Sequence, residues 1–164
     1  MADEQNGSQN GAGAEGGAAQ PSIQVLGQYL KDFSFESPKA PKSLKAPGEN
    51  PNLQIDLNVS VNKLDEDVYE SAIELKGNAT NDDGTIYVVE AVYAGAFNIK
   101  NIPADALEPL LLINCPSILF PFLRRIISDM THEGGFPPLL LDPIDFAGLY
   151  KQRKEAETAQ AGNA

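Results

Sequence analysis

The sequence predicts an α+β domain in which helices cover one face of a four-stranded antiparallel sheet. Two observations support this class. Residues 22–99 contain segments in which apolar and polar side chains alternate, the period of a half-buried strand. Residues 104–150 instead repeat their apolar side chains every three or four positions, the period of an amphipathic helix. Strands followed by helices is the order typical of α+β proteins.

The strand pattern is clearest in residues 53–64, LQIDLNVSVNKL, where five apolar residues alternate with polar ones. Residues 68–80 alternate again, and NDDG at 81–84 predicts a tight hairpin into a strand at 85–99 that is apolar on both faces apart from Glu90. A further strand lies within residues 22–37, before a proline-rich crossover. Near its end, alternation assigns one face to Leu30, Asp32, Ser34 and Glu36 and the other to Tyr29, Lys31, Phe33 and Phe35.

The helical part begins with a short helix around residues 104–113, which Pro109 disturbs. An amphipathic helix follows Cys115 and ends at Gly134-Gly135. Pro121 predicts a local distortion within it. A last helix starts after a cap at Asp142 or Asp145. The apolar stripe of the central helix consists of Leu119, Phe122, Leu123, Ile126, Ile127 and Met130, widened by Ile118.

The helical apolar surface exceeds what one face of a small sheet can cover. The central stripe, the last helix and the segment FPPLLLDPI all need an apolar partner. We therefore expect copies of the chain to associate. We divide the chain into a Gly/Ala-rich leader without fixed structure at 1–21, a folded domain at 22–154 and a second unstructured tail at 155–164.

The net charge of −11 argues against a nucleic-acid partner. No apolar stretch approaches the roughly 20 residues of a bilayer span, and a single cysteine agrees with a reducing compartment, so we expect a cytoplasmic protein. Between Ala46 and Ile99, ten acidic residues stand against two lysines. This acidic region is either a solubilising surface or a docking surface for a basic partner.

The residues that commonly carry catalysis are scarce. One histidine and one cysteine cannot form a Cys/His metal cluster, and the acidic runs do not follow a calcium-loop spacing. Cys115 is either a reactive thiol at a helix start, as in a small hydrolase, or a packed structural residue. Its apolar neighbours favour the second alternative. We expect neither enzymatic activity nor a cofactor.

Three segments resemble the SecB family of bacterial protein-export chaperones: YLKDFSFESPKAP near the start, CPSILFPFLRRIISDM, and GGFPPLLLDPIDFAGLY. The resemblance covers roughly residues 22–150, in the family's order and at compatible spacing. It implies an α+β homotetramer built as a dimer of dimers. It also implies an ATP-independent holdase that keeps precursor proteins unfolded and delivers them to the translocation motor SecA. The alternatives are a SecB-like holdase serving another partner, such as a toxin–antitoxin system, or a general acidic interaction module.

The resemblance also implies roles for individual residues. The SecA contact falls on Asp32, Glu36, Val88 and Glu90. A groove for unfolded clients, between the crossover and the helices, falls on Leu44, Phe136, Leu139, Leu140, Leu141 and Phe146. Subunits would join through the strand face of Tyr87, Val89, Ala91 and Tyr93. The helix stripe Leu119, Phe122, Leu123, Ile126, Ile127 and Met130 would pack between the two dimers.

Overall fold

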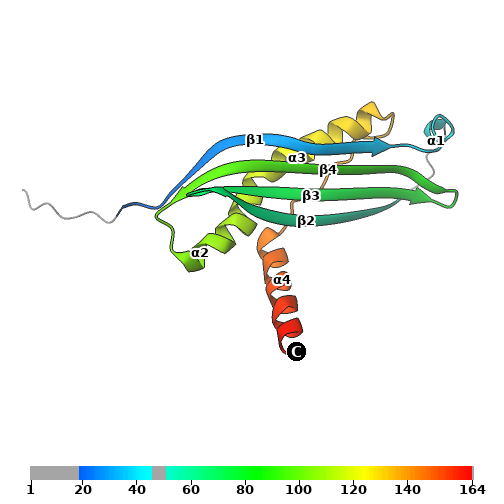
Figure 1. Cartoon of the computed structure of the whole chain (residues 1–164). Helices are drawn as coiled ribbons and strands as arrows, with labels where there is room; N and C mark the ends of the chain where they lie inside the picture. The colour runs from blue at the N-terminus through cyan, green and yellow to red at the C-terminus, as the bar shows by residue number, and fades with distance from the viewer. Residues whose placement is uncertain (1–18, 46–50, 164) are drawn as a thin grey trace, which may run out of the picture.

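The computed structural model describes residues 19–45 and 51–163, and within them the sheet matches the prediction. Its strands are β1 (Ser22–Glu36), β2 (Asn52–Asp65), β3 (Val68–Asn81) and β4 (Gly84–Lys100), in the spatial order β1-β4-β3-β2 (Figure 1). Every neighbouring pair is antiparallel. Because β1 returns to pair with β4, both β1 and β2 are edge strands.

Helical segments follow the sheet, with one short turn in the crossover. They are α1 (Lys42–Lys45), α2 (Ala104–Pro109), the π-helical segment η1 (Leu110–Asn114), α3 (Cys115–Glu133) and α4 (Phe146–Ala161). The helix α3 runs behind the sheet, and α4 extends away beyond β2 (Figure 1). The α+β class with helices on one face is confirmed. Gly135, at φ 87°, takes the left-handed conformation that ends α3 after Glu133. The side chain of Asp145 caps α4 by accepting from the Gly148 N–H at 3.0 Å.

The two helices expected on either side of Asn114 form one continuous helix from Ala104 to Glu133. Its irregular turn is η1, directly after Pro109, whereas α3 continues through Pro121. In η1 the Cys115 N–H bonds to the Leu110 carbonyl, five residues back. The next such bond would join residue 116 to Leu111, but Pro116 has no N–H. The buried Ser71 hydroxyl of β3 donates to the Leu111 carbonyl instead, at 2.9 Å.

This continuous helix corrects the expectation that no segment is long and apolar enough to span a membrane. Over its 30 residues it contains an 18-residue window with a mean hydropathy of 1.6. Length and composition alone do not make it a membrane span, because the sheet occupies one side of it. Leu119, Leu123 and Ile127 are fully buried there.

A β-bulge changes the predicted faces of β1. The pairing shifts between Leu30 and Asp32, so that Lys31 is an extra residue opposite β4. Tyr29 therefore pairs with Ala94 and Asp32 with Val92, which places Tyr29 and Asp32 on the same face. Simple alternation had separated them, because one inserted residue reverses the parity of the residues before it, here as far back as a second shift between Val25 and Gly27.

The core lies between the sheet and α3. Every fourth residue of α3 from Cys115 to Thr131 is buried, and Gly95 of β4 leaves room for Leu119. A Cβ on Gly95 would lie 2.8 Å from the Leu119 Cδ2 atom. The opposing core residues of β4 are Tyr87, Val89, Ala91, Tyr93 and Phe97.

These positions correct part of the expected subunit interface. Side chains buried in the chain's own core have no surface to offer a second copy. The correction applies to Tyr87, Val89, Ala91 and Tyr93 on β4 and to Leu119, Leu123 and Ile127 on α3. A 3.6-residue stripe shows which side of a helix is apolar, but not how much of that side its own sheet covers.

The expected tail is also corrected, because α4 continues to Ala161. Residues 155–161 are therefore helical. The Lys154 Nζ atom lies 2.7 Å from the Glu108 Oε1 atom at the end of α2, and Arg153 pairs with Glu157 one turn further along α4. Most of the expected leader, residues 1–18, lies outside the described residues.

Candidate interaction surfaces

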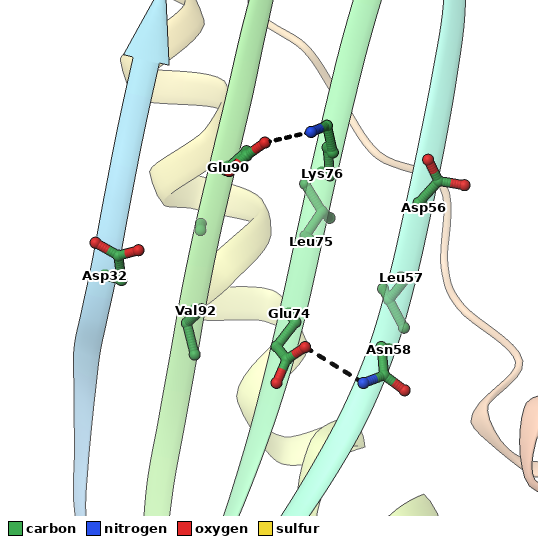
Figure 2. Close-up of a pocket in the computed structure, with 10 residues that line it drawn as sticks. Asp32, Asp56, Leu57, Asn58, Glu74, Leu75, Lys76, Glu90 and Val92 are labelled. Carbon is green, nitrogen blue, oxygen red and sulfur yellow. Dashed lines mark hydrogen bonds and ion pairs between the residues drawn. The ribbon is translucent and has the colours of Figure 1, made fainter.

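The sheet surface opposite α3 is an acidic face. Period-two alternation turns most polar side chains of β2 and β3 toward it, together with Asp32 and Glu36 of β1 and Glu90 of β4. Figure 2 shows Asp32, Asp56, Glu74 and Glu90 on adjacent strands of this face, in front of the helix. Its acidic residues are Asp32, Glu36, Asp56, Glu70, Glu74 and Glu90.

The four residues expected to contact SecA lie together on this acidic face. Glu36 pairs with Val88, and Glu90 lies opposite Ser34, so the first and fourth strands present the four side chains side by side. Among the described residues, neither Asp32 nor Glu36 forms an ion pair, and both are exposed. Their carboxylates are therefore available to a basic partner.

A hollow of about 430 Å³ crosses the acidic face between Asp32 and Asp56. Lys76 lies in it, with its Nζ atom 2.5 Å from the Glu90 Oε1 atom, and this contact raises the pKa of Lys76 (Figure 2). The sequence does not reveal this pair, because Lys76 and Glu90 meet only through the β3–β4 register. Asp56, Glu74 and Val92 were missed for the same reason.

Two acidic residues of the acidic face accept hydrogen bonds from side chains of neighbouring strands. Glu74 accepts hydrogen bonds from the Asn58 amide at 3.3 Å and the Ser60 hydroxyl at 3.2 Å. Glu70 is buried, and three donors from the two edge strands reach it. They are the Lys31 ammonium at 2.8 Å, the Tyr29 hydroxyl at 2.5 Å and the Asn62 amide at 3.3 Å.

We call this second group the Glu70 clasp. Hydrogen bonds from Lys31 and Tyr29 lower the pKa of Glu70, while burial and the carboxylate raise the pKa of Tyr29 to about 12. The small residues Ala94 and Ala96 of β4 lie opposite Tyr29 and Glu70, respectively, in the strand pairing. The clasp thus ties both edge strands to β3, and its charge is compensated inside the chain.

The expected client groove is only partly a surface. Leu44 and Leu140 are exposed, and Leu139 is half-buried. Phe136, Leu141 and Phe146 are buried, which corrects their expected direct access to a client. Phe136 packs in an aromatic cluster with Tyr87 and Phe35, at ring-centroid distances of 4.9 and 6.3 Å. The segment after Gly135 returns over the core and buries several of the apolar residues expected to face a client.

The crossover approaches this segment through one side chain. Leu44 of α1 lies over Gly135, where a Cβ would be 3.0 Å from the Leu44 Cδ2 atom. Leu44 therefore packs against the segment after α3, while apolar surface stays exposed on Leu44 itself and on Leu140. Residues 46–50 of the crossover lie outside the described residues.

Exposed apolar side chains gather on α3 and on the edge strand β1. On α3, Phe122 is 44% and Ile118 is 40% exposed, whereas Ile126 and Met130 are half-buried. The Phe122 ring stacks on Tyr93 at 6.3 Å, so a core residue supports it. The exposed apolar residues of β1, which sequence reasoning missed, are Ile23, Val25, Leu26, Tyr29 and Leu30. This pattern agrees with the expected surplus of apolar surface.

Cys115 does not have the environment of a nucleophile. It is 1% exposed, and burial raises its pKa to about 12, so the thiolate is suppressed at neutral pH. Within the described ranges, no group of three or more His, Cys, Asp or Glu residues is arranged to hold a metal ion.

Comparison with known proteins gives consistent matches. The family model for the preprotein translocase subunit SecB matches residues 16–157. Protein-export protein SecB of Rhodopseudomonas palustris (strain BisB18) is 47% identical over 94% of this chain and 95% of its own length. The SecB of Methylocella silvestris is 50% identical over 88% of this chain and 89% of its own length.

Among solved structures, a SecB-like chaperone of Mycobacterium tuberculosis superposes with a TM-score of 0.63. It was solved in complex with a ChAD peptide from the HigA1 antitoxin. The likeness covers 75% of this chain and 91% of that chain, at 16% identity. At that identity it shows a shared fold.

Proposed function

Because this chain belongs to the SecB family of protein-export chaperones, we propose that it holds precursor proteins unfolded in the cytoplasm and delivers them to SecA from its acidic face. The export-chaperone role follows from the family and from relatives that match nearly the whole chain. The docking surface, the assembly and the client contacts are our proposals. The role requires no bond-making step, in keeping with the buried state of Cys115.

One observation carries the SecA proposal: Asp32, Glu36 and Glu90 share one helix-free face with the apolar Val88. A concentrated negative field attracts a basic partner from a distance, and the apolar side chain adds contact once the partner arrives. A merely solubilising surface needs no such cluster, since acidic residues spread over the molecule would serve equally well.

For assembly, we propose that Phe122 and Ile118 of α3 pack against a second copy and that β1 adds edge contacts. Both sets are exposed and apolar, and β1 has one side without a neighbouring strand among the described residues. The half-buried Ile126 and Met130 extend the α3 surface. If two copies form a dimer through one of these surfaces, two such dimers can associate through the other surface to give a tetramer.

For clients, we propose that Leu44, Leu139 and Leu140 contact apolar segments of the unfolded chain directly. Phe136, Leu141 and Phe146 would support this surface from beneath. Burial of apolar area is non-directional, so such a surface accepts many sequences.

The proposal is tested by mixing the purified protein with an unfolded precursor and with SecA. We expect suppressed aggregation without nucleotide, a native mass of four chains, and SecA binding that weakens with salt. SecA binding that Glu90→Lys leaves unchanged would favour a holdase serving another partner, such as an antitoxin.

A further inference from the structure

The bulge in β1 places a lysine directly beside an acidic residue proposed to contact SecA. Lys31 is the extra residue of the bulge, and Asp32 follows it in the chain and pairs with Val92. Figure 2 shows Asp32 on the acidic face, and the Lys31 ammonium also reaches this face, where it donates to Glu70 at 2.8 Å. An ammonium group so near the Asp32 carboxylate could pair with it and reduce the charge that a basic partner meets.

The Lys31 ammonium instead pairs with an acidic residue further from it in the sheet. Val92 pairs with both Asp32 and Glu74, so these two carboxylates belong to one row across the sheet, whereas Glu70 lies further along β3. The Lys31 Nζ atom lies 2.8 Å from the Glu70 Oε1 atom, and among the described residues Asp32 forms no ion pair. The contact of Lys31 with Glu70 therefore leaves Asp32 without a cation.

Burial explains why Glu70 is the preferred partner of Lys31. The Glu70 side chain is 7% exposed, whereas Asp32 is exposed and keeps its hydration. A buried carboxylate that has lost its water needs charged and polar donors, because an uncompensated buried charge is costly. Tyr29 and Asn62 donate to the same carboxylate at 2.5 and 3.3 Å. The Lys31 ammonium thus stabilises the fold more at Glu70 than it would at Asp32.

We propose that Glu70 is a positioning residue for SecA binding, because by holding the Lys31 ammonium it keeps the Asp32 carboxylate free for the basic partner. This inference rests on the SecA docking surface proposed above and adds a buried residue that the partner need not touch. Lys76 on the same face differs, since its partner Glu90 is exposed and is itself one of the proposed contacts. One lysine is therefore neutralised away from the contact residues, and the other occupies one of them.

The first test variant is Glu70→Asp, which keeps the net charge but shortens the side chain by a methylene group and so withdraws the carboxylate from Lys31. We expect the released ammonium to pair with Asp32 and to weaken binding to surface-immobilised SecA about threefold to tenfold at about 50 mM salt. The loss should shrink at about 500 mM salt, where exposed charge pairs are screened. The control is Glu66→Asp, the same shortening at an exposed residue between β2 and β3.

A rescue experiment separates this role from a loss of stability. In the Glu70→Asp background, Lys31→Met removes the released ammonium and should restore SecA affinity to within about twofold of the parent. The midpoint of thermal unfolding should stay lowered, because the ion pair does not form again. Lys100→Met at the end of β4 makes the same change in net charge and should not restore the affinity.

Two further measurements show which carboxylate carries the effect. In an Asp32→Asn background, Glu70→Asp should change SecA affinity less than about twofold, because the released ammonium has no carboxylate there to neutralise. Lys31→Gln in the parent needs no change at a buried position. It should leave SecA affinity within about twofold, whereas Lys76→Gln should raise it, because only Lys76 occupies a contact residue.

Equal losses from Glu70→Asp in the parent and Asp32→Asn backgrounds would overturn the inference. So would equal rescue by Lys31→Met and Lys100→Met, since net charge alone would then explain it, or an equal rise in affinity from Lys31→Gln and Lys76→Gln. If Glu90→Lys weakens SecA binding but Glu70→Asp leaves it unchanged, the inference fails and the docking surface stands. If the parent does not bind SecA, or Glu90→Lys leaves its binding unchanged, both fail.

Discussion

Lys76 and Glu90 form an ion pair at the centre of the acidic face, with the Lys76 Nζ atom 2.5 Å from the Glu90 Oε1 atom. Asp32 on β1 and Asp56 on β2 lie on either side of this pair. Glu90 is one of the residues proposed to contact SecA, and Lys76 lines the hollow beside it. The side chains are 56% and 47% exposed, so water screens the pair and its contribution to folding is small. Its effect on binding is larger, because a basic partner must compete with Lys76 for Glu90.

We therefore expect Lys76→Gln to increase affinity for SecA about threefold to tenfold at low salt, by freeing Glu90 and removing a repulsive charge. Glu90→Gln should decrease it. Surface-immobilised SecA and a salt series provide the measurement. The matched control is Lys100→Gln at the end of β4, which changes net charge equally but lies outside the hollow. A weaker complex with Lys76→Gln would show that Lys76 itself contacts the partner.

Phe122→Glu should separate the proposed assembly surface from the core. The side chain is 44% exposed, so the chain should still fold, but a charge within a subunit contact is costly. Native mass spectrometry should show a shift from four chains to a smaller species. Leu64→Glu is the control, because Leu64 is 53% exposed and lies on β2, away from α3 and β1. Equal loss of assembly in both variants would contradict an interface on α3.

Most of the fold could be predicted from the sequence, because alternation and helical period are local properties. The acidic face followed only in part: alternation placed Asp32 and Glu36 on one face of their strand, but only the strand pairing shows that this face is shared with Val88 and Glu90. What could not be predicted depends on register or on how much surface a neighbour covers. The bulge at Lys31, the Lys76–Glu90 pair and the burial of Val89 and Leu123 are of this kind.

Cys115 gives a test between the chaperone and the thiol-hydrolase alternatives. Its pKa is raised to about 12 by burial, so the reactive thiolate is scarce at pH 7. Alkylation of the native protein should therefore be slow, at least about a hundredfold below that of the denatured chain. Mass spectrometry of quenched samples gives both rates. Fast labelling of the native protein would contradict the buried position.

The Glu70 clasp should make stability depend on pH in a defined direction. The pKa of Glu70 is lowered in the folded state, so its contribution is present above the unfolded value near 4.5 and is lost as pH falls through the lower folded value. The pKa of Tyr29 is raised to about 12, so its contribution is present below its ordinary value near 10 and is lost as pH rises between these values.

We expect Glu70→Gln to lower the free energy of unfolding by about 1–2 kcal/mol at pH 7, because Lys31 loses its charged partner. The difference from the parent should shrink as pH falls below 4.5 and through the lower folded pKa of Glu70. Tyr29→Phe, which removes one donor and keeps the ring, should cost less. Urea unfolding at a series of pH values gives the free energy of unfolding of the parent and of both variants. A Glu70→Gln deficit that does not change as pH falls below 4.5 would exclude a role for the charge.

The hydrogen bond from the Ser71 hydroxyl to the Leu111 carbonyl joins the helix to the sheet, and we expect it to stabilise the fold. Pro116 cannot donate to the Leu111 carbonyl, and the Ser71 hydroxyl takes that place at 2.9 Å. Ser71→Ala should therefore leave a buried carbonyl without a donor and lower the free energy of unfolding by about 1–3 kcal/mol. Pro116→Ala restores a backbone N–H at the position that would complete a second π-type bond.

A double-mutant cycle separates this explanation from simple loss of packing. If Pro116→Ala supplies the missing donor, Ser71→Ala should cost at least about 1 kcal/mol less in the Pro116→Ala background than in the parent. Thr131→Ser, a similarly small change at a buried position of α3, should show no such coupling with Pro116→Ala. Additive effects of Ser71→Ala and Pro116→Ala in urea unfolding would mean that Ser71 does not replace the proline's missing donor.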